Sequence, residues 1–311
     1  MARFSRLPEG YNPNLVLNLR KDLEGGELLI PGEIVGKPSV FTRRECLVLV
    51  HGFNNHSGEA AVAYLGFRSS ECDHFEDLSP EALEKLLGDT FWPGDAKWAG
   101  PLDWLDFMVY PAAVGTAKLA GPPLGDLICQ FPMLERVHLI GHSLGCRVVL
   151  ETLFDLRARN YPLVKIGGIC LMAAAVPNSM VEQGGRFASL LDDLGAAGAK
   201  LLVLHSTKDT VLHFAFPLGQ TAAGQGEGWF PTALGRFGPP HGMRGIVFQE
   251  AVAGAGHSDY WGHNSSAASR ASTSAVGDFF KLGYKPRVMK SREFKIARDV
   301  GWAREPLQNE W

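Results

Sequence analysis

The strongest chemical signal in the sequence is a serine held between two glycines, in the run GHSLG at residues 141–145. The apolar run 137–140 precedes this pattern, and a stretch with helical character, 147–158, follows it. A strand, a sharp turn and a helix in this order are typical of a turn that presents a serine hydroxyl as a nucleophile. The two glycines leave room where side chains would strike the neighbouring strand and helix. The pattern predicts Ser143 as a nucleophile, and the alternative is a tight turn with a serine cap.

A serine hydroxyl is a weak nucleophile, so it needs a base, and the base needs a partner that orients it. In chains with this turn the order is serine, then Asp or Glu, then histidine. Asp209 follows the apolar run 201–204, and ligands bind at this carboxyl edge of a parallel sheet. Asp192 and Asp193 precede that run and belong at the opposite edge. Asp209 is therefore the predicted acid, with an ordinary loop aspartate as the alternative.

The predicted base is His257, one of ten histidines in the chain. It follows the last strand-like run, 245–252, and the small residues 253–256 allow the loop to bend back toward the serine. The alternative for this histidine is a simple loop hydrogen bond. The rival histidines are His263, which lies farther along at the start of the last helix, and His205, His213 and His241, which precede the final strand.

Two backbone N–H groups are expected to face the oxygen that becomes negative during attack on a carbonyl. One belongs to Leu144, directly after the serine. The other belongs to Phe53, in the loop after the apolar run 46–50. Gly52 allows close approach of this loop, and the His51 side chain is expected to brace it rather than to transfer protons.

The elements that must position these residues form a regular pattern. Short runs that are apolar on nearly every residue, as in strands covered on both faces, alternate with helical stretches. This alternation predicts an α/β protein with one doubly wound, mostly parallel sheet flanked by helices. The strand-like runs are 46–50, 90–92, 137–140, 164–172, 201–204 and 245–248, and the helical stretches are 58–67, a segment that starts at 79–81, and 147–158.

The whole chain, residues 1–311, is predicted to form a single domain, because neither a repeat nor a linker poor in apolar residues divides it. Residues 1–40 are expected to form an N-terminal extension or a short hairpin packed across the domain. Residues 212–243, which are rich in glycine, are a candidate lid or pocket loop, with a surface loop as the alternative. Residues 285–311 are predicted to pack as a C-terminal extension, with a homo-oligomer contact as the alternative.

Composition and charge say little about the substrate. With a net charge of −3 and 46% hydrophobic residues, the chain has no overall attraction to nucleic acid or to anionic membranes. No apolar stretch approaches the roughly 20 residues that span a bilayer, and the first residues lack the apolar core of a signal peptide. Five scattered cysteines favour buried free thiols over a disulfide framework. A cytoplasmic protein is expected.

With these residues assembled, the sequence resembles the α/β-hydrolase superfamily over roughly residues 46–280. More narrowly, it resembles a bacterial branch of hydrolases without assigned function. That branch has a His-Gly-aromatic-Asn-Asn run after the first core strand, a later Trp-Pro pair and a Gly-His-Ser turn, found here at residues 51–55, 92–93 and 141–143. The resemblance implies the same three catalytic residues that the chain order predicts.

Serine at this turn predicts acyl transfer, whereas dehalogenases and epoxide hydrolases of the superfamily use aspartate there. Ser143 would attack a carbonyl, His257 would take its proton, and Asp209 would stabilise the imidazolium before water hydrolyses the acyl-enzyme. Small-molecule carboxylic esters are the expected substrates, and no metal or organic cofactor is expected. The alternatives are a lipase, a thioesterase or an amidase, or a noncatalytic binding protein that retains the fold.

Large side chains near the expected site suggest an apolar substrate pocket. For each aromatic residue the alternative is that it fills the core or a loop contact. The candidate pocket residues are His142, Trp92, Trp229, Phe230 and Trp261.

Overall fold

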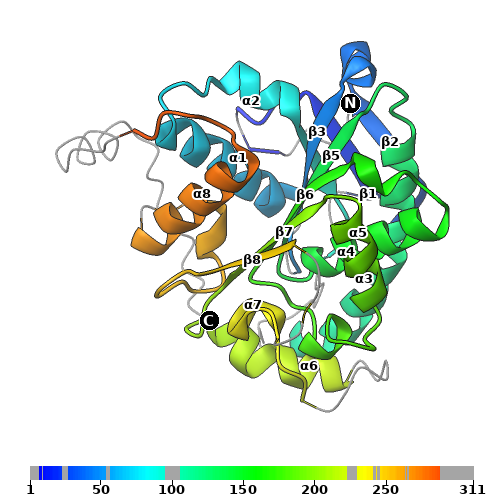
Figure 1. Cartoon of the computed structure of the whole chain (residues 1–311), viewed down its shortest axis with the longest axis vertical. Coiled ribbons are helices and arrows are strands. Elements are labelled where there is room, and N and C mark those ends of the chain that lie inside the picture. Colours follow the sequence, from blue (N-terminus) through cyan, green and yellow to red (C-terminus); the bar gives the residue numbers. More distant parts are fainter. Residues whose placement is uncertain are drawn as a thin grey trace.

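A computed structural model describes residues 7–8, 10–22, 27–53, 57–94, 106–222, 230–240, 243, 246–262, 264 and 266–287. An eight-stranded sheet crosses the centre of this part of the chain, with helices on both of its faces (Figure 1). The strand order is β2-β1-β4-β3-β5-β6-β7-β8, and every neighbouring pair except β1 and β2 is parallel. This confirms the predicted doubly wound, mostly parallel sheet.

The strands coincide with the apolar runs because the central ones are covered on both faces. In β3, β5, β6 and β7 most residues are buried, and most positions are therefore apolar. The strands are β1 (Leu15–Arg20), β2 (Leu28–Gly36), β3 (Glu45–Val50), β4 (Leu87–Phe91), β5 (Arg136–His142), β6 (Ile166–Met172), β7 (Lys200–His205) and β8 (Ile246–Ala251).

The helices form two layers and one end group (Figure 1). One face of the sheet carries α1 (Ser57–His74), α2 (Pro80–Leu86) and α8 (Ala267–Phe280). The other face carries α3 (Asp106–Cys129), α4 (Gly145–Ala158) and α5 (Ala188–Ala196). Beyond the carboxyl end of β7 lie a π-helical turn (Val211–Ala215), α6 (Phe216–Ala222) and α7 (Leu234–Phe237).

The N-terminal segment forms a hairpin, but the hairpin extends the sheet instead of lying across the domain. β1 pairs antiparallel with β2 and parallel with β4, where Val16 lies opposite Asp89. All six residues of β1 are buried, whereas β2 is the half-exposed edge strand. Residues 15–36 therefore form a short hairpin at the edge of the sheet, where β1 completes the row of parallel strands.

The beginning of the C-terminal segment packs on the end of α1. The N–H of Glu76 donates to the Lys285 carbonyl over 2.9 Å, and the N–H of Arg287 donates to the His74 carbonyl over 2.6 Å. The remainder of the predicted C-terminal extension, 288–311, lies outside the described residues. Among the helices that are described, none has the length and apolar character needed to cross a membrane.

An unusual carboxyl group lies between α1 and α8. Glu71 is fully buried, and neither of its carboxyl oxygens has a hydrogen-bond partner among the described residues. Burial raises the pKa of Glu71 well above its usual range, and the negative charge of Asp278 on α8 raises it further. Burial raises the pKa of the Cys170 thiol on β6, and the Glu71 carboxyl adds to this increase. Burial therefore favours the neutral form of Glu71 in the folded protein.

Replacing Glu71 by methionine is expected to stabilise the fold at alkaline pH. As the pH rises above the ordinary pKa of glutamate, Glu71 ionises more readily in the unfolded chain than in the folded chain, so the wild type loses stability. Methionine removes this loss and fills a similar volume, and we expect the free energy of unfolding to rise by about 1–3 kcal/mol at pH 8. Urea unfolding of both proteins at pH 8 and pH 4.5 measures this change in the free energy of unfolding. The gain should shrink at pH 4.5, and an equal gain at both values would contradict this account. Glu76→Met, at an exposed position, is the control.

Candidate active site

The turn between β5 and α4 holds Ser143 in an uncommon backbone conformation. Its φ is +52°, in the left-handed region that residues other than glycine rarely adopt. The Ser143 N–H donates to the Met172 carbonyl over 2.9 Å, and the Ser143 carbonyl accepts from the Ala175 N–H over 3.1 Å. The end of β6 therefore holds the strained turn in place and keeps the serine at the carboxyl edge of the sheet.

The two glycines of the turn permit a close approach of backbone on either side. A Cβ on Gly145 would lie 2.6 Å from the Val50 carbonyl oxygen and closer still to that of His51, at the end of β3. A Cβ on Gly141 would lie 2.8 Å from the Cα of Cys146, in the first turn of α4. The strand and the helix thus leave no space for side chains at these positions, as the sequence predicts.

The three residues predicted as a triad meet at this edge. His257, in the loop after β8, lies with Nε2 at 2.8 Å from Ser143 Oγ and Nδ1 at 2.7 Å from Asp209 Oδ2. Asp209 follows β7 and is fully buried, whereas His257 is partly exposed. In the neutral tautomer that fits both contacts, Nδ1–H donates to Asp209 and Nε2 accepts the serine proton. The arrangement is a continuous relay from a hydroxyl to a buried carboxylate.

The surroundings of Asp209 keep its carboxyl group ionised. Burial alone raises the pKa of Asp209, but the charge and hydrogen bond of His257 lower it more, so the pKa lies below its usual value. A further contribution comes from the Leu212 N–H, which donates to Asp209 Oδ1 over 2.9 Å. Arg236 Nη1 donates to the Asp209 carbonyl over 2.7 Å and fixes the loop. The carboxylate can therefore stabilise a positive charge on His257.

The loop that carries His257 is fixed by two side chains. His142 Nε2–H donates to the His257 carbonyl over 2.8 Å, across the gap between the serine turn and this loop. Asp259 Oδ2 accepts the Gly256 N–H over 2.8 Å on the other side of the histidine. His142 was a candidate pocket residue, but its side chain is buried and faces this loop. That prediction is wrong, because the ring is used to hold the backbone of His257.

The rival acids and bases lie elsewhere or outside the described part of the chain. Asp193 is on α5, before β7, and pairs with Arg157 over 3.0 Å at the opposite edge of the sheet. His213 is exposed in the π-helical turn, with its ring 4.2 Å from that of Phe214. Residues 241 and 263, which are histidines, are outside the described residues.

The loop after β3 lies directly against the serine. A Cβ on Gly52 would lie 2.9 Å from Ser143 Cβ, so only glycine allows this approach. Leu144 is buried and precedes the first residue of α4, and no backbone carbonyl among the described residues accepts its N–H. The two amides predicted to face an oxyanion, those of Phe53 and Leu144, thus belong to the two segments that flank the serine side chain.

His51 braces this loop, as the sequence predicts. Its Nδ1–H donates to the Gly52 carbonyl over 2.9 Å, and its Nε2 accepts the Trp92 N–H over 3.3 Å. The Trp92 indole N–H donates a hydrogen bond of 2.8 Å to the His51 carbonyl, and the two rings stack with their centroids 5.7 Å apart. Trp92 is fully buried by these contacts, so its prediction as a pocket residue is wrong.

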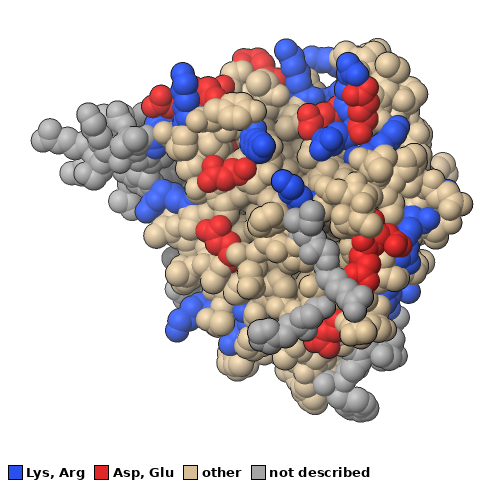
Figure 2. All heavy atoms as spheres, in the orientation of Figure 1, with Lys and Arg blue, Asp and Glu red and all other residues tan. Residues whose placement is uncertain are grey.

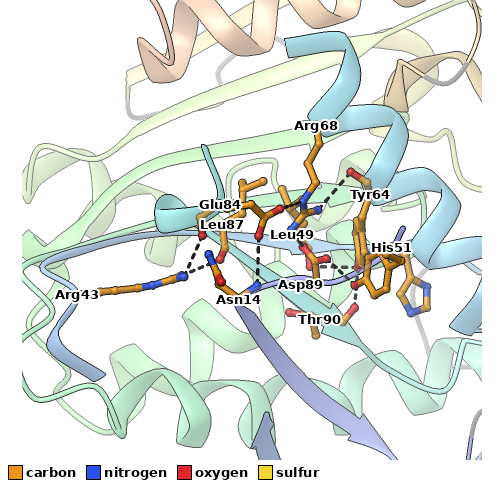
Figure 3. Close-up of polar contacts among 11 residues, drawn as sticks. Asn14, Arg43, Leu49, His51, Tyr64, Arg68, Glu84, Leu87, Asp89 and Thr90 are labelled. Carbon is orange, nitrogen blue, oxygen red and sulfur yellow. Dashed lines mark hydrogen bonds and ion pairs between the residues drawn. The ribbon is translucent and has the colours of Figure 1, made fainter. Parts of the chain in front are cut away.

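A tyrosine that no sequence pattern marks anchors the same loop from α1. Tyr64 OH accepts the His51 N–H over 3.0 Å and donates to the Thr90 carbonyl over 2.6 Å, with the Leu49 carbonyl at 3.1 Å (Figure 3). The phenol therefore joins the ends of β3 and β4 where the loop begins.

A buried ion cluster fixes the helix that carries this tyrosine. Arg68 on α1 pairs with Glu84 and, over 3.0 Å, with Asp89 on β4 (Figure 3). Tyr11 OH donates to the second oxygen of Asp89 over 2.5 Å, and Arg68 Nη1 donates to the Tyr64 carbonyl over 3.2 Å. The cluster ties α1 to the N-terminal segment and to β4 below the loop.

The remaining pocket candidates divide between core and surface. Trp261 is buried, with its ring edge-on to Tyr64 at 5.5 Å, so its prediction as a pocket residue is wrong. Phe230 is exposed near the end of α6, and Trp229 lies outside the described residues. The half-buried ring of Phe53, in the loop after β3, packs edge-on against Tyr110 on α3 at 5.4 Å, a contact that the sequence does not predict.

The fold and the site define a class of protein. A mostly parallel sheet with a serine turn after β5, an acid after β7 and a histidine after β8 has the arrangement of an α/β hydrolase. A family described as "Alpha/beta hydrolase of unknown function (DUF900)" matches residues 39–226, more than half of the chain, and the protein belongs to this family. The match includes Ser143 and Asp209 and ends before His257. No curated protein matches the sequence.

Several solved structures are similar to this chain. Carboxyl esterase 2 of the mycorrhizal fungus Tuber melanosporum is 14% identical, with 90% of this chain and 93% of that chain covered and a TM-score of 0.42. Esterase B of Lactobacillus rhamnosis is 11% identical, with 96% and 94% covered and a TM-score of 0.41. A Pyrobaculum calidifontis esterase is 14% identical, with 76% and 75% covered and a TM-score of 0.39.

Proposed function

We propose that this protein is a serine hydrolase that cleaves carboxylic esters through an acyl-enzyme intermediate. The observation that carries the proposal is the relay from Ser143 Oγ through His257 to the buried carboxylate of Asp209, with contacts of 2.8 and 2.7 Å. In this relay Nε2 of the histidine is oriented to accept a proton from the serine hydroxyl. Such an arrangement activates a hydroxyl for attack on a carbonyl carbon.

In the first half of the proposed reaction, Ser143 Oγ bonds to the ester carbonyl carbon while His257 Nε2 takes the hydroxyl proton. The carbonyl oxygen becomes negative and accepts hydrogen bonds from the Leu144 and Phe53 N–H groups. When the tetrahedral intermediate collapses, His257 gives its proton to the departing alcohol. Asp209 remains ionised throughout and stabilises the transient imidazolium.

In the second half, water attacks the acyl-enzyme with His257 as the base, and the acid product leaves with the serine restored. The same relay would also act on thioesters, so the thioesterase alternative differs only in the leaving group. A noncatalytic protein with this fold would not react through Ser143. Both alternatives are open to direct measurement.

Covalent labelling by a fluorophosphonate tests the proposal. We expect the wild type to label and to hydrolyse p-nitrophenyl esters, and we expect Ser143→Ala to do neither. Ser39→Ala, at an exposed serine before β3, is the control and should behave as the wild type. An unlabelled wild type, or equal labelling of Ser143→Ala, would overturn the proposal. A butyryl thioester measured beside p-nitrophenyl butyrate separates a thioesterase from an esterase.

His142 is a positioning residue in this proposal, because it acts on the backbone of His257. His142→Phe keeps a ring but removes the 2.8 Å bond to the His257 carbonyl. We expect kcat to fall about 10–100-fold with little change in KM, since a small displacement of the base weakens proton transfer. His142→Gln retains a donor and should recover part of the loss. Steady-state kinetics on a soluble ester measure both variants, and a wild-type kcat for His142→Phe would contradict this role.

A further inference from the structure

An exposed apolar surface borders the candidate active site. Four large side chains contribute to it, with exposed fractions of 64% for Phe214, 56% for Leu218, 60% for Phe230 and 52% for Phe237. Single exposed apolar residues are ordinary on protein surfaces, but a contiguous group marks a surface that binds something apolar. We call these four residues the apolar rim.

The members of the rim are held together by the helices beyond β7. Phe214 and Leu218 are four residues apart in the continuous helical segment 211–222 and therefore share one face. The Phe230 N–H donates to Thr221 Oγ1 over 2.8 Å, which ties this residue to the end of α6. Phe237 ends α7, which contacts the π-helical turn 211–215 and lies, like α6, at the lower end of the molecule (Figure 1).

The same helical segment is anchored in the candidate site. Its first turn is capped by Asp209, whose Oδ1 accepts the Leu212 N–H over 2.9 Å. Its inner face is buried at Leu212 and Phe216. A Cβ on Gly219 would lie 2.5 Å from the ring of Tyr110, which packs against Phe53 beside Ser143. The inner face of this segment thus reaches the site, and its outer face forms the rim.

The rim is also uncharged along its helical part. Residues 210–222 contain no Asp, Glu, Lys or Arg. Among the described atoms, the lowest part of the molecule, where α6 lies, carries few charged side chains on the face that Figure 2 shows. Protein interfaces usually surround an apolar centre with polar and charged groups. Arg236 lies over the ring of Phe237 at 5.3 Å, so the uncharged part of the rim is its helical part. This helical part matches hydrocarbon better than it matches a second protein.

We propose that the apolar rim binds the surface of an aggregated, uncharged lipid ester, so that long-chain acyl esters are the substrates of the site. The choice of substrate rests on the proposed esterase function, whereas the binding of lipid by the rim does not. Phe214 and Leu218 enter the hydrocarbon, and the ester groups of the lipid are then presented next to Phe53 and Tyr110. A short, soluble ester reaches Ser143 without this contact.

Flotation with a triolein emulsion coated with phosphatidylcholine tests the binding. The parent chain is Ser143→Ala, which cannot consume the lipid. We expect it to float with the emulsion, and we expect the addition of Phe214→Ser and Leu218→Ser to lower the bound fraction at least tenfold. High salt should not release the parent, because the rim carries no charge along its helix.

The matched control carries Ile30→Ser and Val164→Ser in the same parent, two apolar residues that are 67% and 68% exposed on other surfaces. It should float as the parent does. The inference is overturned if the parent stays in solution, or if the rim and control variants bind equally. It is also overturned if the rim substitutions convert a dimer into a monomer in size-exclusion chromatography while the parent does not bind the emulsion.

Activity separates this inference from the proposed function. With Ser143 intact, the ratio of triolein hydrolysis to p-nitrophenyl acetate hydrolysis should fall at least tenfold in the rim variant and stay constant in the control. Hydrolysis of the soluble ester without emulsion binding would overturn the rim inference alone. Emulsion binding without hydrolysis of any ester would support the lipid surface and overturn both the proposed function and the substrate that rests on it.

Discussion

Replacing Asp209 by asparagine is expected to lower kcat on a soluble ester by about 10⁴-fold, with little change in KM. The carboxylate accepts the Nδ1–H of His257 over 2.7 Å and so fixes the tautomer in which Nε2 faces Ser143. An amide that donates to Nδ1 would select the other tautomer, and it carries no charge to stabilise the imidazolium. Because the Leu212 N–H can still bond to an amide oxygen, the fold should be retained.

Asp193→Asn is the matched control, since Asp193 is the rival acid before β7 and pairs with Arg157 at the surface. It should have wild-type kinetics. Circular dichroism and urea unfolding check that the Asp209 variant is folded. A folded Asp209→Asn protein with full activity would mean that another acid orients His257, or that the base is a different residue.

The parts of the fold that the sequence predicts are those in which local pattern and burial agree. The runs at 46–50 and 201–204 are apolar throughout, and 137–140 is apolar except at His138, because helices cover both faces of these strands. The order of the residues after β5, β7 and β8 then places Ser143, Asp209 and His257 at one edge, because parallel strands share their carboxyl ends. Pattern and topology suffice here without any long-range detail.

The hydrophobic pattern does not predict α3, because Pro111, Pro122 and Pro123 interrupt it. Proline usually ends a helix, but tertiary packing maintains this one. At Gly121 a Cβ would lie 2.6 Å from Glu151 Cβ on α4, so the two helices are in close contact. Propensity is a local quantity, and here contacts between distant segments override it.

The aromatic residues show a second limit of prediction from the sequence. Trp92 and Trp261 could line a pocket or fill the core, and only their partners decide between these roles. Trp92 belongs to the core, where its indole N–H donates to the carbonyl of His51, 41 residues away in the sequence. Tyr64 anchors the loop after β3 only because α1 places its hydroxyl between the ends of β3 and β4. Such roles depend on assembled geometry and leave no periodic signal.

Gly145, in the serine turn, tests how closely this turn packs against the end of β3. In Gly145→Ala the new Cβ would lie 2.6 Å from the Val50 carbonyl oxygen and nearer still to that of His51. Both are backbone atoms, so no side chain can turn away, and β3 must separate from the serine turn. We expect the free energy of unfolding to fall by about 1–3 kcal/mol or more. The shift would also move Leu144 relative to Phe53, and kcat/KM on a soluble ester should fall at least about 100-fold.

Gly115→Ala is the control, because a Cβ on this glycine of α3 would meet no atom within 4 Å. Alanine favours a helix over glycine by about 0.5–1 kcal/mol, so this variant should be slightly more stable than the wild type, with unchanged kinetics. Urea unfolding and steady-state kinetics on both variants make the comparison. If Gly145→Ala is as stable and as active as Gly115→Ala, the close contact between β3 and the serine turn is not what holds Ser143 beside the loop after β3.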